Sequence, residues 1–320
     1  MIAKPNRRSG SPGRFGAYAS ILIVAGFFMG CTATGYLKEG ESFYAGPSIN
    51  FNTHGRVAGR NSLKSELEEM ITPKPNSKFL GSRISVWIYY VTGGERDTKG
   101  IGGWIRKKFG KKPVLITDAK PEVTANVLQG NLFNRGFFES QVRSSVERKK
   151  KESRVIYDIE LYPPFTIREI TVPRDSIFSN EEELMQETFV KTGERYNLEK
   201  LGDEQSRIEM YLEDLGYYYF DDRNLIFEAD TTVGGRKVDL NLTYAPGTPE
   251  KAKRKYTLSS VDIINDYEIR NSRVDSTSVL QRDTVTVDGY GYASLNDNFR
   301  PEILTNAINI ASGELYSRTA

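Results

Sequence analysis

Alternation of apolar and polar residues is clearest between residues 165 and 244 of this 320-residue chain. From Val238 to Tyr244 every second residue is apolar, which is typical of a strand with one buried face. Residues 165–172 are rich in β-branched side chains and also indicate a strand, as does the short run at 224–230. The segment therefore contains three predicted strands.

Two helices are expected between the first and second of these strands. Ser179 followed by three glutamates predicts a helix N-cap with acids in the first turn, and this helix is expected to run to about Lys191. Apolar residues then recur at helical spacing from Leu198 to Leu215, and Gly216 ends this second helix. The order is β-α-α-β-β, which predicts an α+β unit with two helices on one face of a three-stranded sheet.

The same unit recurs on both sides of this segment. Residues 132–138 (LFNRGFF) parallel residues 212–218 (LEDLGYY), since both end a helix at glycine and place two aromatics before the next strand. Residues 312–316 (SGELY) parallel residues 192–196 (TGERY). The chain is therefore expected to be a row of similar modules.

The repeat predicts a leading segment followed by three modules. These parts cover residues 1–30, 31–163, 164–246 and 254–320. The first module carries an insertion of about 40 residues at about 73–113, and its closing strands are expected at 141–147 and 154–161. The third module is expected to be incomplete, with a first strand over 256–264 and a helix over 301–310 but no second helix and no closing hairpin.

The N-terminal segment has the pattern of a signal peptide. Basic residues precede an apolar run from Ala17 to Met29, which is shorter than the roughly 20 residues of a membrane-spanning helix. Cys31 follows and is the only cysteine in the chain, which excludes an internal disulfide. A cysteine in this place is similar to the lipobox cysteine of lipoproteins, which carries acyl chains such as palmitate. A chance cysteine is the alternative.

Composition and charge leave little support for an enzyme or a nucleic-acid binder. Basic and acidic residues nearly balance, with 44 against 42, so no nucleic-acid partner is expected. The single histidine, His54, has no acid or cysteine at a ligand spacing, and the acidic clusters are explained by a helix cap and a turn. We therefore expect no catalytic residue, no metal site and no cofactor.

The repeated unit, with its G-E-x-Y turn and its L-x-x-L-G-Y-Y helix end, resembles the POTRA domain of the BamA/TamA family of outer-membrane assembly factors. The insertion resembles that of TamL, the lipoprotein form found in Bacteroidetes. The resemblance implies tandem modules with a three-stranded mixed sheet, and a chain truncated before a β-barrel. It also implies a lipid anchor in the outer membrane, a periplasm-facing arm, unfolded outer-membrane proteins as clients and a TamB-like periplasmic partner.

The resemblance further implies that the second strand of each module lies at a sheet edge, where an extended client could pair with it. The candidate client-binding residues are Gln141, Val142, Arg143, Leu225, Ile226, Phe227 and Glu228. The alternative is a lipid-anchored scaffold that docks another envelope protein without handling clients. A cell-wall hydrolase has little residue support.

The insertion combines aromatic and basic residues within a short stretch. These residues are Trp104, Arg106, Lys107, Lys108 and Phe109. Such a mixture suits anionic lipid headgroups, so membrane-surface contact is one interpretation. The other is a solvated basic loop whose aromatics turn inward, and the sequence alone favours this second interpretation.

Overall fold

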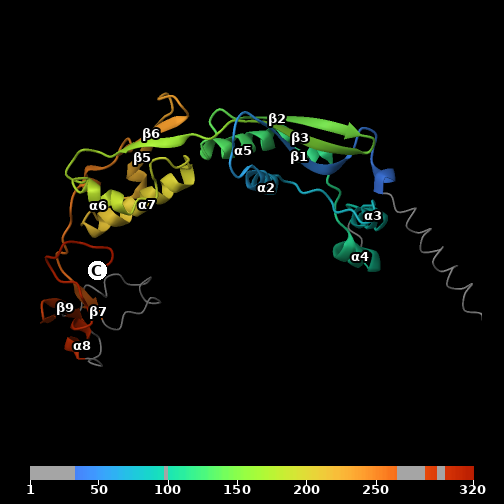
Figure 1. Cartoon of the computed structure of the whole chain (residues 1–320). Helices are drawn as coiled ribbons and strands as arrows, with labels where there is room; N and C mark the ends of the chain where they lie inside the picture. The colour runs from blue at the N-terminus through green and yellow to red at the C-terminus, as the bar shows by residue number, and fades with distance from the viewer. Residues whose placement is uncertain (1–32, 97–99, 265–284, 294–299) are drawn as a thin grey trace, which may run out of the picture. The chain divides into compact units, whose positions relative to one another are not determined.

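The computed structural model describes residues 33–96, 100–264, 285–293 and 300–320 (Figure 1). The predicted signal peptide and Cys31 lie outside the described residues. The chain forms two compact units, of which one extends to residue 163 without residues 134–136, and the other contains residues 134–136 and 164–320. Within the described ranges, every helix is too short or too polar to cross a bilayer.

The first unit has a three-stranded mixed sheet in the order β1-β3-β2. Strand β3 pairs in parallel with β1 and antiparallel with β2. Its elements in chain order are η1 (Ala33–Tyr36), β1 (Phe43–Thr53), α2 (Arg60–Met70), α3 (Ile84–Val91), α4 (Ile101–Phe109), η2 (Ile116–Ala119), α5 (Pro121–Asn134), β2 (Gln141–Lys149) and β3 (Glu152–Leu161). The expected strands at 141–147 and 154–161 are therefore present and slightly longer.

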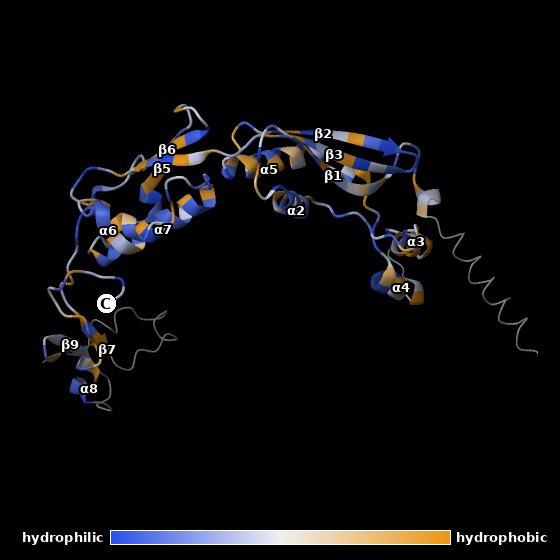
Figure 2. Cartoon of the chain, in the orientation of Figure 1, coloured by the Kyte–Doolittle hydropathy of each residue, from blue (hydrophilic) through white to orange (hydrophobic). Residues whose placement is uncertain are grey.

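Helices α2 and α5 cover one face of this sheet (Figure 1). Leu67 of α2 and Leu132 of α5 are fully buried against Tyr157 and Ile159 of β3. Apolar residues alternate with polar ones along β3, as Figure 2 shows, because alternate side chains point to the helices and to solvent. Burial raises the pKa of the Tyr44 hydroxyl, at the start of β1, to about 12.

The second unit begins with a module of the same topology. Its sheet has the order β4-β6-β5, with β4 and β6 parallel and β5 antiparallel to β6. The elements are β4 (Thr166–Thr171), α6 (Glu181–Gln186), α7 (Leu198–Asp214), η3 (Asp222–Asn224), β5 (Leu225–Asp230), β6 (Lys237–Tyr244) and η4 (Glu250–Lys253). The predicted order β-α-α-β-β and the α+β fold class are confirmed.

Helix α6 differs from its prediction at both ends. Asn180, not Ser179, is the N-cap residue, and the Ser179 hydroxyl donates to the Ser176 carbonyl instead. The helix ends at Gln186, well short of the expected Lys191. The helix ends there because the N–H of Phe189, just after it, donates to the Glu204 carboxylate on α7. The local sequence does not reveal this contact.

The remaining elements form a third, smaller sheet in the order β7-β9-β8. They are β7 (Asp262–Ile264), β8 (Val285–Val287), β9 (Tyr290–Ala293) and α8 (Pro301–Thr305). Strand β9 pairs in parallel with β7 and antiparallel with β8. The β8-β9 hairpin, which the sequence analysis did not assign, precedes helix α8 and is therefore not a closing hairpin after the helices. Helix α8 is also shorter than the expected 301–310.

The G-E-x-Y turn repeats because it forms backbone hydrogen bonds with the segment at the start of its own module, residues 165–167 or 256–258. In the second module Gly193 N–H donates to Ile167 C=O at 2.7 Å, and Tyr196 N–H donates to Phe165 C=O at 3.0 Å. The equivalent turn over 312–316 makes the same two bonds to residues 258 and 256, at 2.6 and 2.9 Å. The motif thus holds the turn against this starting segment through backbone hydrogen bonds.

The glycine at the end of each preceding helix accepts a backbone hydrogen bond from the first residue of the same segment. Phe165 N–H donates to Gly136 C=O and Tyr256 N–H donates to Gly216 C=O, both at 2.8 Å. Gly216 has a φ of +99°, and a Cβ there would lie 2.6 Å from Cδ1 of Leu315. Both the backbone conformation and the close approach therefore require glycine.

Candidate functional site

Strand β2 lies at one edge of the first sheet and β5 at one edge of the second. An edge strand has one row of backbone N–H and C=O groups that no neighbouring strand pairs. The candidate client-binding residues in 141–143 and 225–228 therefore do lie on edge strands. The direction of each N–H decides which of these residues could pair with a client.

The start of the β2 edge is already occupied by a side chain. Val142 N–H donates to Oε1 of Gln129 at 2.9 Å, and Gln129 Nε2 donates to Ser140 C=O at 2.7 Å. The Gln129 amide, on α5, thus takes the place of a neighbouring strand at this point. The edge at residues 141–143 is closed to a client at Val142, while the N–H groups of Gln141 and Arg143 face β3.

The free part of the edge begins at Ser144. Backbone groups alternate in direction along an antiparallel strand, so the N–H groups of Ser144 and Val146 point away from β3, as that of Val142 does. Ser145 N–H points toward its partner Ile156 on β3. The open edge therefore begins one residue beyond the candidate residues in 141–143.

A groove runs beside this open edge. It has a volume of about 500 Å³ and lies between residues 120–123, at the start of α5, and residues 144–146 of β2. A second hollow of about 460 Å³ adjoins it through Lys120 and Val123. The walls expose apolar side chains, with Val123 59% and Val127 50% exposed. An extended chain lying here could pair with β2 and place apolar side chains against α5.

The β5 edge is open in a different setting. Ala245 N–H donates to Asn224 C=O at 2.8 Å, and Gln205 Nε2 donates to Leu225 C=O at 2.5 Å. By alternation, Phe227 N–H faces the open edge, whereas Ile226 and Glu228 face β6. A hollow of about 410 Å³ lies over the open face of this sheet and is lined by four acidic side chains from its three strands, namely Glu169, Glu228, Asp230 and Asp239. The β2 edge is the better site for an apolar extended chain.

The insertion folds into two helices that the sequence reasoning did not assign. Trp104 is 57% exposed and Phe109 50% exposed, so the favoured interpretation of aromatics turned inward is wrong. Lys107 and Lys108 are exposed as well. Arg106 has a separate role, because Nη1 donates to the carbonyls of Gly94 and Arg96 at 3.0 and 2.6 Å and so holds the connection between α3 and α4.

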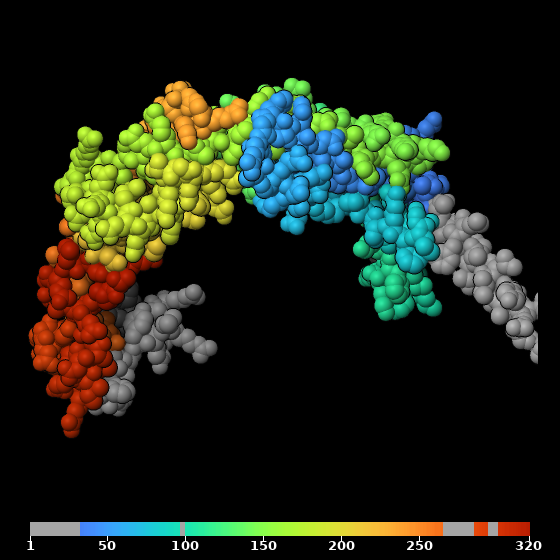
Figure 3. Space-filling model, viewed as in Figure 1, coloured from blue at the N-terminus to red at the C-terminus, as the bar shows by residue number. Residues whose placement is uncertain are grey.

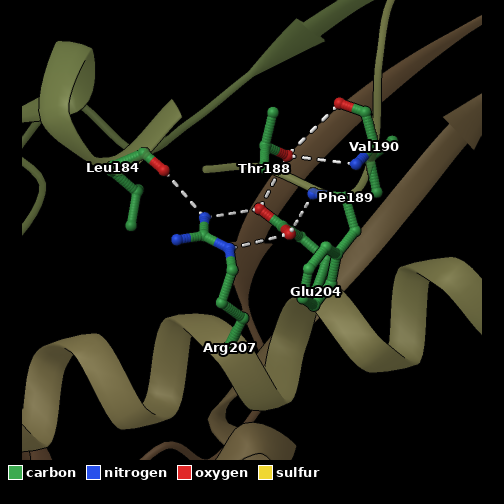
Figure 4. Close-up of polar contacts among 6 residues, drawn as sticks. All are labelled: Leu184, Thr188, Phe189, Val190, Glu204 and Arg207. Atoms are coloured by element: carbon green, nitrogen blue, oxygen red, sulfur yellow. Dashed lines mark hydrogen bonds and ion pairs between the residues drawn. The ribbon is translucent and has the colours of Figure 1, made fainter. Parts of the chain in front are cut away.

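Glu204 forms a buried polar cluster in the second unit that sequence reasoning missed (Figure 4). Its carboxylate is 2% exposed and accepts hydrogen bonds from Thr188 Oγ1 at 2.8 Å and Phe189 N–H at 2.9 Å. Arg207 donates to both carboxylate oxygens and also, at 2.8 Å, to Leu184 C=O. Both oxygens are fully engaged, so the cluster joins α7 to the segment after α6 and leaves no room for a ligand.

The only histidine, His54, contacts one carboxylate and stacks on one aromatic ring. His54 Nε2 lies 2.5 Å from Oε2 of Glu160, and its ring stacks on Tyr162 at 4.5 Å between centroids. Hydrogen bonds from His54 and Asn52 hold the pKa of Glu160 below its usual range. In the described part of the chain no group of three or more candidate ligands could hold a metal ion. The absence of catalysis stays a prediction.

Comparisons with known proteins give structural similarity only. No protein-family model matches the chain, and no curated protein matches it. Among solved structures, POTRA domains 3–5 of BamA from Haemophilus influenzae align with a TM-score of 0.37 and 14% identity, over 88% of this chain and 84% of that chain. POTRA domains 1–2 of Omp85 from Anabaena align with a TM-score of 0.33 and 13% identity, over 65% and 98%.

A third similar structure is the N-terminal domain of Omp85 from Thermosynechococcus elongatus, with a TM-score of 0.33 and 12% identity, over 88% of this chain and 82% of that chain. These scores and identities are low. The fold assignment therefore rests on the element order and the strand pairing described above, in which a β-α-α-β-β unit closes a three-stranded mixed sheet with its second strand at the edge.

Proposed function

We propose that this chain is the periplasmic arm of an outer-membrane protein assembly or translocation factor, and that it binds unfolded outer-membrane proteins by β-augmentation along β2. The observation that supports this function is the free backbone of Ser144 and Val146 beside an apolar groove. Backbone pairing supplies affinity for many client sequences, and a groove with valines on its wall accepts alternate apolar side chains.

Adjacent serines allow a matched test. Proline at residue 144 removes an N–H that faces the open edge, which edge strands tolerate, whereas proline at residue 145 removes one that bonds β3. Ser144→Pro should lower crosslinking between a photoreactive residue placed at Val123 and a denatured outer-membrane β-barrel protein, with an unchanged melting temperature. Ser145→Pro should lower the melting temperature by roughly 5–10 °C.

The alternative function is a scaffold that docks another envelope protein without handling clients. If Ser144→Pro leaves both the fold and the crosslinking unchanged, the β2 edge is not the client site and the scaffold becomes the better account. A TamB-like periplasmic partner belongs to either function, since an edge strand can pair with a folded partner as well as with a client.

We further propose that Cys31 is acylated and holds the arm on the outer membrane, facing the periplasm. The basic start, the apolar run and the lone cysteine of the first 31 residues support this anchor. Two acyl chains are enough for durable membrane binding, at about 0.8 kcal/mol per buried CH₂. Labelled palmitate should enter the natural chain and not Cys31→Ser, and incorporation into both would show another site of modification.

A further inference from the structure

The insertion carries a concentration of positive charge. Between Ile101 and Lys112 there are five basic residues and no acidic one, whereas the whole chain has a net charge of +2. In the described part of the chain Lys112 pairs with Glu95 at 2.9 Å, while Lys107, Lys108 and Lys111 form no ion pair with a carboxylate. Three exposed ammonium groups are thus available to an anionic partner.

Large apolar side chains are exposed among these cations. Ile101, Trp104 and Lys108 follow the i, i+3, i+7 spacing of one helix face, and Ile101 is 79% exposed. The Lys108 ammonium lies 5.0 Å from the centroid of the Trp104 ring and 5.5 Å from that of Phe109. Aromatic rings beside a lysine with an apolar stem are the combination that suits a membrane–water interface.

The two helices form a fixed platform within the first unit. Arg106 bonds the connection between them, and Val86 of α3 is fully buried with Phe43 and Ala33. Tyr36 stacks on Tyr90 with 4.8 Å between the ring centroids. Helices α3 and α4 project from the sheet of this unit, as Figures 1 and 3 both show in teal and green. Their exposed aromatics are therefore presented outward and not held by a loose loop.

The platform lies beside the chain segment that follows Cys31. Element η1 begins at Ala33 and packs against α3 through the Tyr36–Tyr90 stack. Ala33 follows Cys31 by two residues in the sequence. If Cys31 is acylated, as the proposed function has it, the same side of the unit that carries the platform would face the bilayer.

We infer that the α3–α4 platform, residues 84–96 and 100–112, is a membrane-surface site that binds anionic phospholipid headgroups through Lys107, Lys108 and Lys111 while Trp104 and Phe109 enter the interface. The charge complementarity selects an anionic bilayer over a protein groove, because Lys107 and Lys108 on α4 and Lys111 just after it lie near exposed apolar side chains of the same helix. The site is separate from the β2 edge and needs no client.

The test uses the chain beginning at Thr32, which keeps every described residue and has no acyl chain. Trp87 and Trp104 are the only tryptophans, so Trp87→Phe leaves Trp104 as the sole indole reporter. Vesicles of phosphatidylcholine with roughly 30% anionic phosphatidylglycerol should shift Trp104 fluorescence to the blue. Brominated lipids in the same vesicles should quench it, and phosphatidylcholine alone should do neither.

A charge-matched pair of variants separates the platform from general electrostatics. Lys107→Gln with Lys108→Gln should weaken vesicle binding roughly 20- to 30-fold, because each lysine near an anionic surface adds attraction. Lys149→Gln with Lys150→Gln removes the same charge from the exposed end of β2 and the turn after it, in the same unit, and should leave binding unchanged.

Equal weakening by both pairs would overturn the inference, since net charge alone would then explain binding. An unchanged Trp104 spectrum with phosphatidylglycerol vesicles would overturn it too, as would the same blue shift with soluble glycerol phosphate, which would indicate a site for a free phosphate. Because the chain tested lacks Cys31, none of these outcomes bears on acylation, and palmitate labelling decides that question independently.

Discussion

Replacing Glu204 with alanine is the sharpest test of how the second module is held together. The substitution removes the acceptor of Thr188 Oγ1 and Phe189 N–H and leaves Arg207, which is 11% exposed, without its carboxylate. Removing one partner of a buried ion pair costs about 3–5 kcal/mol, because the other charge stays buried and uncompensated. Arg207 keeps its 2.8 Å bond to Leu184 C=O, so we expect a loss of about 3 kcal/mol.

Hydrogen exchange read by mass spectrometry in increasing urea suits this test, because it assigns opening free energies to peptides and does not require the whole chain to unfold in one step. Peptides over 184–190 and α7 should lose about 3 kcal/mol of protection in Glu204→Ala. Asp203→Ala is the matched control, since Asp203 is the exposed neighbour on the same helix, and its effect should lie within about 0.5 kcal/mol. A loss below about 1 kcal/mol for Glu204→Ala would refute the assignment of the cluster as the main link.

Three further outcomes follow from burial, backbone and charge. Leu212→Ala should lower the opening free energy of α7 peptides by about 2–5 kcal/mol, because Leu212 is fully buried. Gly216→Ala should lower the unfolding free energy by about 1–3 kcal/mol because of its backbone conformation alone, and the clash with Leu315 adds to this loss. Adding Leu315→Ala should remove the clash and therefore recover only part of the total loss. Burial opposes ionisation of Glu152, but hydrogen bonds from two basic side chains outweigh it and hold its pKa below the usual value. The melting temperature should therefore fall as pH drops below about 4.5, and less so in Glu152→Gln.

Strand positions were predictable because their signal is local and has a period of two. Residues 238–244 form β6 with Val238, Leu240 and Leu242 buried, as their alternation predicts. Helix α7 also matches its prediction from 198 to 214, since Leu201, Ile208 and Leu212 repeat on one face. In both cases the buried face belongs to a single element, so its periodicity appears within one stretch of sequence.

Contacts between distant residues account for the features that the sequence did not predict. Helix α6 ends early because Phe189 N–H bonds Glu204, fifteen residues away. The start of the β2 edge is closed by Gln129, whose amide could have been recognised only once α5 was known to lie beside β2. The sequence around Glu204 and around Gln129 has no pattern that distinguishes a side chain engaged in the fold from a solvated one.

The two complete modules share a topology, yet their edges differ in the chemistry that a partner would meet. Beside β2 the wall of the groove is formed by Val123 and by the free backbone of Ser144 to Val146. In the second sheet a hollow over the open face is lined by four carboxylates from β4, β5 and β6, of which Asp239 alone has a basic partner, Arg168, among the described residues. An apolar client that paired with β5 and also covered this face would remove the hydration of those carboxylates without replacing it, which is unfavourable. A common fold therefore gives each module an edge, and the side chains around it decide which edge can bind.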